Sequence, residues 1–223
     1  MNSATPIGAW YPVRHVGCLV LLGLGLLAGC GSLLPKPPAQ PALFVLDDTA
    51  ATASDRPTEP PRIAAVSTLV VNEPRAAPGY TTRQIAYVRT PHQLEYFAFS
   101  EWVEPPALML APLLAHAIER TRAFRAVVRA PTAVAGDLRL ETEVVRLQQD
   151  FSVAPSRVRL TLRAALIDTA TRRVVATREF DADAASASED PPGGVMAANE
   201  VVGRVAAQVG AFCAEWIVRG EHR

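Results

Sequence analysis

The sequence lacks an excess of charge of either sign, a dense set of cysteines and a long uninterrupted apolar run. Its 223 residues carry 22 basic and 22 acidic side chains, a balance that argues against a nucleic-acid-binding protein, which would show a basic excess. Apolar residues make up 49% of the chain, which excludes a disordered protein. No run reaches the ~18 consecutive apolar residues typical of a membrane-spanning helix. The length fits one domain with a short appendage.

Motifs that carry chemistry are also missing. There is no Gly-x-Ser-x-Gly nucleophile turn and no phosphate-binding loop. The four histidines, at positions 15, 92, 116 and 222, have no second ligand at metal-binding spacing. We therefore expect a protein that is not an enzyme and that has no catalytic residue, no cofactor and no metal site.

The first 29 residues predict an export signal. The apolar run Val16–Ala28 has 13 residues, which is too short to span a bilayer but suits a signal-peptide core. It ends in Leu27-Ala28-Gly29-Cys30, which resembles the lipobox of bacterial lipoproteins. The resemblance implies cleavage after Gly29 and attachment of diacylglycerol and an N-acyl chain to Cys30. The alternative is an ordinary secretory signal in which this cysteine has no role.

Gly31 would be the second residue of the mature chain. By resemblance to Gram-negative lipoproteins, a residue other than Asp here implies anchoring in the outer membrane, facing the periplasm. The alternative is the periplasmic face of the inner membrane. We thus expect a signal peptide over residues 1–29, a lipidated cysteine with a proline-rich tether over 30–42, and one domain over 43–223.

Hydrophobic periodicity in that domain predicts an α+β fold, with a mostly antiparallel sheet packed on two helices. Turn signals and the polar, proline-rich breaks at 49–61 and 184–194 separate the elements. Pro112 should kink the first helix or delay its regular part, and a change of parity near Val145 predicts a β-bulge. The expected strands are 44–46, 62–71, 84–89, 94–99, 124–128, 137–147, 157–168 and 173–183; the expected helices are 105–121 and 195–216.

Two features of these elements have competing interpretations. Glu141 and Glu143 share one strand face, and we favour ion pairs with Arg159 and Arg163 over paired catalytic carboxylates. Cys213 lies on the apolar face of the last helix. We favour a buried, unreactive thiol there over an intermolecular disulfide.

Aromatic residues are few, at 6% of the chain, but six of them fall within 23 residues. One interpretation is a partner interface, because Tyr and Trp combine apolar area with a polar group. The other is that Phe97 and Trp102 anchor a helix to the sheet. The six candidates are Tyr80, Tyr87, Tyr96, Phe97, Phe99 and Trp102.

Several short motifs follow the tether in order. They are Arg83-Gln84-Ile85-Ala86-Tyr87-Val88-Arg89, Leu94-Glu95-Tyr96, Trp102-Val103-Glu104-Pro105-Pro106, Asp137-Leu138-Arg139-Leu140 and a closing alanine-rich helix with Trp216. With the lipobox, this order resembles the ABC-type transport auxiliary lipoprotein family over nearly the whole mature chain. One departure is Phe44, where the family usually has Tyr.

The resemblance implies a non-catalytic binding subunit of a system that moves lipids between the inner and outer membranes. The implied partners are a periplasmic MCE-domain protein and, through it, an ABC permease and ATPase, with the membrane contacted through the lipid anchor. A homo-oligomer is compatible with this role. The alternatives are an outer-membrane assembly lipoprotein that plugs or chaperones a β-barrel, and a periplasmic hydrolase, which the missing nucleophile motif disfavours.

Overall fold

The structure is a computed structural model that describes residues 39–47 and 67–220. The predicted signal peptide, Cys30, most of the predicted tether and the first part of the strand expected at 62–71 lie outside the described residues. The chain divides into two units, and the second, Gln40–Arg223, contains all the elements described below.

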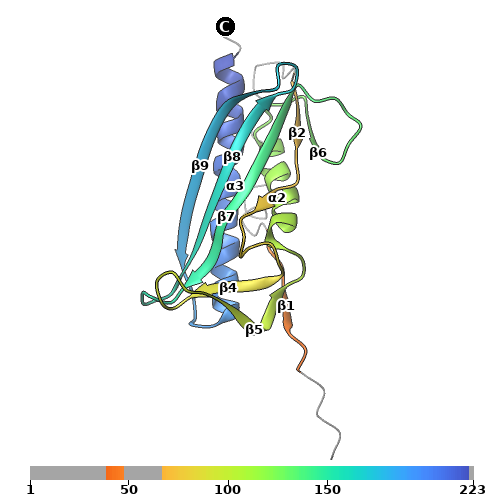
Figure 1. Cartoon of the computed structure of the whole chain (residues 1–223). Coiled ribbons are helices and arrows are strands. Elements are labelled where there is room, and N and C mark those ends of the chain that lie inside the picture. The colour runs from red at the N-terminus through yellow and green to blue at the C-terminus, as the bar shows by residue number, and fades with distance from the viewer. Residues whose placement is uncertain (1–38, 48–66, 221–223) are drawn as a thin grey trace, which may run out of the picture. The chain divides into compact units, whose positions relative to one another are not determined.

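Within the described residues, this unit contains nine strands and two helices, which confirms the predicted α+β class (Figure 1). The two-residue strand at 75–76 is too short to leave a pattern in the sequence. In chain order the elements are β1 (Ala42–Phe44), β2 (Thr68–Val71), β3 (Arg75–Ala76), β4 (Gln84–Val88), β5 (Leu94–Trp102), α2 (Pro106–Arg120), β6 (Ala126–Arg129), β7 (Leu138–Asp150), β8 (Arg157–Asp168), β9 (Arg173–Ala185) and α3 (Pro191–Gly220).

The sheet is mixed, with β7 as its central strand. Long antiparallel ladders join β7 to β8 and β8 to β9, and a shorter one joins β4 to β5. Along its other edge, β7 pairs in parallel with β2, β3 and β4 in succession. β6 adds to β2 and β1 adds to β5, again in parallel. The register between β7 and β8 shifts between Val144 and Arg146, which confirms the predicted bulge.

The core lies between the inner face of the sheet and the two helices. α3 runs along β8 and β9, and α2 lies beside it (Figure 1). The predicted inward residues of β8 are all buried: Val158, Leu160, Leu162, Ala164 and Leu166. Gly210 lets the helices approach closely, since a Cβ there would lie 2.9 Å from the Ala117 carbonyl oxygen.

α2 begins within one residue of its expected start, whereas α3 begins four residues earlier than expected. α2 is regular from Pro106, so Pro112 does not delay it. α3 begins at Pro191, inside the stretch that the sequence predicted to be a break. Proline suits the first position of a helix, and the Asp190 carboxylate accepts a hydrogen bond from the Gly193 amide at 2.9 Å. The residues Pro191 to Gly194, which were predicted to interrupt the chain, therefore form the first turn of α3.

α3 also has the length and hydropathy of a membrane-spanning helix, because it covers 30 residues with few charges. However, half of its most apolar 18-residue window is buried inside the domain. The helix packs there against β8, β9 and α2, as a core helix does.

Candidate functional site on β4 and β5

The six aromatic candidates lie on β4, on β5 and in the loop before β4, and their environments differ. Trp102 and Tyr87 are buried, at 3% and 7% exposure, whereas Phe99 is 64% exposed. Tyr80, Tyr96 and Phe97 are half-buried. Burial changes along β5 rather than between its two faces, because Phe97 and Phe99 share one face by parity and differ in exposure. Neither sequence interpretation therefore covers the whole set.

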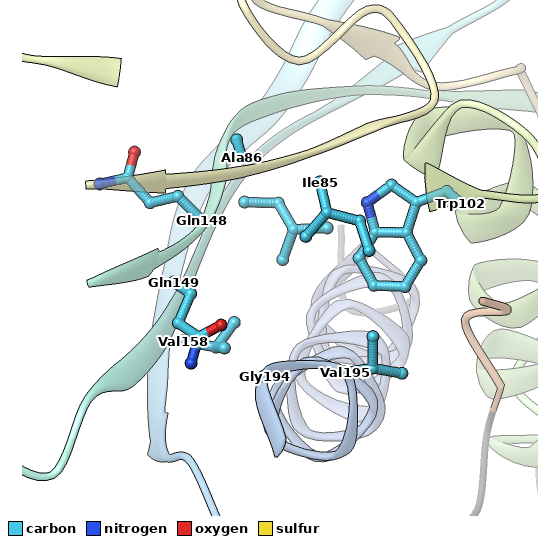
Figure 2. A pocket seen from close by; sticks show the side chains of 9 residues that line it. Ile85, Ala86, Trp102, Gln148, Gln149, Val158, Gly194 and Val195 are labelled. Atoms are coloured by element: carbon cyan, nitrogen blue, oxygen red, sulfur yellow. The ribbon is translucent and has the colours of Figure 1, made fainter. Parts of the chain in front are cut away.

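Trp102 belongs to the core. Figure 2 shows its indole beside Ile85 and above Gly194 and Val195, at the start of α3. These residues line a cavity of about 10 Å³, room for about one water molecule. Trp102 therefore anchors α3 to the sheet.

Gln149 closes the same cavity from the other side (Figure 2). It is 2% exposed, and its Nε2 donates to the hydroxyl oxygens of Ser156 and Ser186 at 3.0 and 3.2 Å. Its Oε1 has no hydrogen-bond partner among the described residues. A Cβ at Gly194 would lie 2.2 Å from this oxygen, so any larger residue there would force the Gln149 side chain to move.

Tyr87 and Phe97 form a ring cluster on β4 and β5. Their ring centroids are 4.5 Å apart, and Phe151 packs edge-on against Tyr87 at 5.8 Å. Phe151 was missed by sequence reasoning, because only the parallel pairing of β4 with the end of β7 brings it here. The Arg89 guanidinium lies 4.8 Å from the Tyr87 ring centroid, a cation–π contact. The Tyr87 hydroxyl donates to Glu95 at 3.0 Å. These contacts hold the hairpin rigid.

Tyr80 and Tyr96 fasten the loop that precedes β4. The Tyr96 hydroxyl donates to the Gly79 carbonyl oxygen at 3.0 Å, and the Tyr80 hydroxyl donates to Gln148 Oε1 at 2.5 Å. Gly79 has a φ of +95°, and a Cβ there would meet Leu94 at 2.8 Å. Burial raises the pKa of Tyr80, so the phenol stays a neutral hydrogen-bond donor.

Phe99 has a different environment, because its side chain is exposed on β5, the strand next to the edge strand β1. β1 pairs with β5 in parallel, with Leu43 opposite Glu101, so Leu43 and Phe99 are diagonal neighbours on one face. Leu43 and Val45 are 55% and 52% exposed. We call Leu43, Val45 and Phe99 the edge patch. An apolar edge strand is a surface that proteins usually cover or use for binding.

The charged residues of β7 and β8 make ion pairs, as favoured from the sequence. Glu143 pairs with Arg163 at 3.4 Å, as expected. The expected partnership with Arg159 is wrong: Glu141 pairs with Arg75 at 3.8 Å, and Arg159 lies 3.9 Å from Asp150. In an antiparallel ladder, the lower numbers of β8 face the higher numbers of β7, so Arg159 lies opposite Gln148.

Cys213 is fully buried on α3, and burial raises the pKa of its thiol to about 12. A thiol with so high a pKa is a poor nucleophile near neutral pH. Among residues 39–47 and 67–220, no three His, Cys, Asp or Glu side chains gather as metal ligands. His92 lies in the β4–β5 turn, and His116 lies 3.8 Å from Glu119 on α2.

The family model for the ABC-type transport auxiliary lipoprotein component matches residues 44–210 of this chain. The match covers more than half of the chain and runs from the end of β1 into α3, so the chain belongs to this family. No curated protein matches it in sequence.

Three solved structures match this chain to different degrees. Protein XCC0632 from Xanthomonas campestris is 22% identical with a TM-score of 0.67, and the match covers 83% of this chain and 98% of that one. The PelC dodecamer of Paraburkholderia phytofirmans is 15% identical with a TM-score of 0.42, covering 69% and 95%. Lipoprotein GNA1162 of Neisseria meningitidis is 13% identical with a TM-score of 0.35, covering 63% and 99%. Only the first is similar enough to support the fold.

Proposed function

We propose that this member of the ABC-type transport auxiliary lipoprotein family is a lipid-anchored, non-catalytic binding subunit of a transport system that moves lipids between the inner and outer membranes. Its direct partner in this proposal is a periplasmic MCE-domain protein, and through it an ABC permease and ATPase. The observation that carries the proposal is the family match over residues 44–210, which spans nearly the whole described domain. The domain accordingly needs a binding surface rather than a reaction centre.

The anchor in this proposal is Cys30, with its acyl chains in the outer membrane. Two or three chains on one cysteine bind a bilayer stably, whereas a single chain binds only marginally. Nine residues separate Cys30 from Gln40, the first residue of the second unit. Even fully extended, a segment of this length spans at most roughly 35 Å. A partner must therefore reach the domain close to the bilayer.

The edge patch is the docking surface that we propose for the partner. Phe99, Leu43 and Val45 are each more than half exposed, and they lie beside the Arg83–Glu101 ion pair, whose nitrogen and oxygen are 2.9 Å apart. Apolar side chains next to a charged rim are the usual composition of a protein interface. The ring cluster of Tyr87, Phe97 and Phe151 holds the strand that carries Phe99 in place.

Crosslinking and affinity purification of the full lipoprotein from native membranes test the proposal. We expect an MCE-domain protein, a permease and an ATPase with the wild type, and their loss with Phe99→Asp. Val174→Asp is the matched control, because Val174 is 57% exposed but lies at the start of β9, away from the edge patch. Val174→Asp should capture the same partners as the wild type.

Three outcomes decide the matter. If the wild type captures no MCE-domain protein or permease, the proposed function is wrong. If it captures an outer-membrane barrel alone, the assembly-lipoprotein alternative replaces it. If Phe99→Asp captures the partners as well as the wild type does, the function stands but the edge patch is not the interface.

A further inference from the structure

A groove of about 500 Å³ opens on the outer face of the sheet, the face opposite the helices. Its floor is formed by the outward side chains of β7 and by Arg159 of β8, and its walls are the loop before β4 and the β4–β5 turn. This volume suits a small organic ligand. The lining residues are Pro78, Tyr80, Val88, Pro91, His92, Gln93, Leu94, Arg146, Gln148, Asp150, Ser152 and Arg159.

The charged side chains of the groove come from neighbouring positions on β7 and β8. Arg146, Gln148 and Asp150 alternate with buried residues along β7, so they share its outer face. Arg159 lies opposite Gln148 in the register, which makes it the diagonal neighbour of Arg146 on one side and of Asp150 on the other. Diagonal neighbours are ~7–8 Å apart at Cα, so two guanidinium groups can reach the oxygens of one anion.

Both arginines keep donors available. The Nε and Nη2 atoms of Arg146 donate to the Thr161 hydroxyl oxygen at 3.3 and 3.0 Å. Arg159 Nε lies 3.9 Å from Asp150 Oδ2, too far for a hydrogen bond. Among the described residues, the terminal nitrogens of Arg159 and the Nη1 atom of Arg146 have no hydrogen-bond partner. Arg146 Nη2 also lies 3.9 Å from Asp181 Oδ1, an ion pair that is too long for a hydrogen bond.

Asp150 is the last of the three outward residues of β7 in the groove, and it supplies one negative charge. Burial is the largest influence on its pKa and raises it, but two hydrogen bonds from Ser152 and the charges of Arg159 and Arg146 leave the pKa below its usual value. The carboxylate is therefore ionised at neutral pH. Ser152 occupies Oδ1 through both its amide and its hydroxyl, at 2.9 and 2.5 Å, so Oδ2 is the oxygen that remains for a ligand.

The apolar walls complete the site. Val88, Leu94, Pro78 and Pro91 offer carbon surface beside the charges. The loop that carries Pro78 is fixed by the hydrogen bonds of Tyr80 to Gln148 and of Tyr96 to Gly79. Such a wall suits the methylene groups that link a phosphate to an amine, and its rigidity lowers the entropy lost on binding.

We propose that this groove binds a phosphodiester that carries a nearby primary amine, with the phosphate between Arg146 and Arg159 and the ammonium at Asp150. Two sources have this chemistry: the headgroup of a membrane lipid, and a free glycerophosphoethanolamine-type ester. The lipid as source rests on the proposed function, whereas the site itself does not.

Calorimetric titration of the detergent-purified full lipoprotein tests the site. The probe is glycerophosphoethanolamine, and glycerophosphoglycerol is the comparison ligand, because it has the same phosphodiester without an amine. We expect saturable binding of the first, weakened about tenfold by Arg159→Gln, since a hydrogen bond to a charged group is lost. Asp150→Asn should abolish the preference for the amine-bearing ester. Arg163→Gln, on the same face but outside the groove, should bind like the wild type.

Native mass spectrometry of the same preparations separates the two sources. An amine-bearing phospholipid retained by the wild type and lost from Arg159→Gln identifies the membrane lipid. Binding of the soluble ester without any retained lipid identifies the free ester. If neither ligand binds, or if Arg159→Gln binds both as the wild type does, the proposal is wrong. Arg159→Gln should still capture the transport partners, so a failed groove and a failed docking function give different results.

Discussion

On β8, successive side chains alternate between two environments. Leu160 and Leu162 are fully buried against the inner layer, whereas Arg159 and Arg163 point outward among carboxylates. The inner residues remove apolar surface from water, which contributes most of the stability of a fold. The outer ion pairs are exposed to solvent, where such pairs typically contribute less than ~1 kcal/mol each. The inner face of β8 therefore stabilises the fold, whereas its outer face is available for binding.

This difference indicates where function can reside. A residue on the inner face cannot change without disturbing packing, whereas the outer face tolerates substitution. Both proposed binding surfaces, the edge patch and the groove, consist of residues that point away from the core. If the two faces differ as we describe, core substitutions should alter stability strongly and outer substitutions should alter binding alone.

Leu162→Ala should give the largest loss of stability. Leu162 is fully buried on the inner face of β8, and removing a side chain of this kind leaves a cavity that the neighbours fill only in part. We expect the free energy of unfolding to fall by about 2–5 kcal/mol, measured by urea denaturation. A loss below about 1 kcal/mol would mean that the inner face is not what holds β8 in place.

Gly194→Ala should give the next largest loss of stability. The new Cβ would lie 2.2 Å from Gln149 Oε1 and 2.8 Å from its Cδ, so Gln149 must move and its bonds to Ser156 and Ser186 would be disturbed. We expect a loss of about 1–3 kcal/mol in the same measurement. Gly220→Ala is the control on the same helix, because the nearest atom there is 3.9 Å away.

A second substitution identifies the clash. If Gln149 is the residue that Gly194→Ala displaces, Gln149→Ala should cost less in the Gly194→Ala background than in the wild type. Additive losses would show that the alanine acts elsewhere.

Cys213, which is buried in the core on α3, tests how the core responds to charge. Burial raises the pKa of its thiol from 9.0 to about 12, so above pH 9 the unfolded chain loses this proton while the folded chain keeps it. Stability is therefore lost as pH rises, by about 1 kcal/mol at about pH 10. Cys213→Ala lacks this contribution, so its unfolding free energy should depend less on pH between 9 and 11. Equal pH dependence in the two proteins would contradict the assignment.

The long elements of this fold were predictable because their patterns are local. β8 alternates over its whole length and was predicted with its observed bounds, Arg157–Asp168. The parallel pairings of β2, β3 and β4 along β7 were not predicted, because short strands carry no signal of their partners. The sequence prediction placed the start of α3 too late, because Pro191 and Gly193 usually interrupt helices. Only the hydrogen bond from the Gly193 amide to Asp190 shows that these residues form its first turn.

The candidate site was predictable only as a set of residues. Composition drew attention to the aromatics between Tyr80 and Trp102, but it could not separate the buried Trp102 from the exposed Phe99, since both lie on a strand with apolar residues on both faces. The groove was not predicted at all. It requires the register that sets Arg159 beside Gln148, and that register depends on the bulge and on tertiary pairing.

Arg163→Gln should have the smallest effect, although it removes two ion pairs from the residue next to Leu162. The guanidinium lies 3.0 Å from Glu179 and 3.4 Å from Glu143, but the side chain is 55% exposed, and water and salt screen such pairs. We expect a change within about 0.5 kcal/mol by urea denaturation, and no difference at about 1 M salt. A loss above about 1 kcal/mol would mean that the ion pairs on the outer face also stabilise the sheet. The two faces would then not differ as proposed. Weaker ligand binding by Arg159→Gln could in that case come from a loss of folded protein, and the two effects would have to be measured separately.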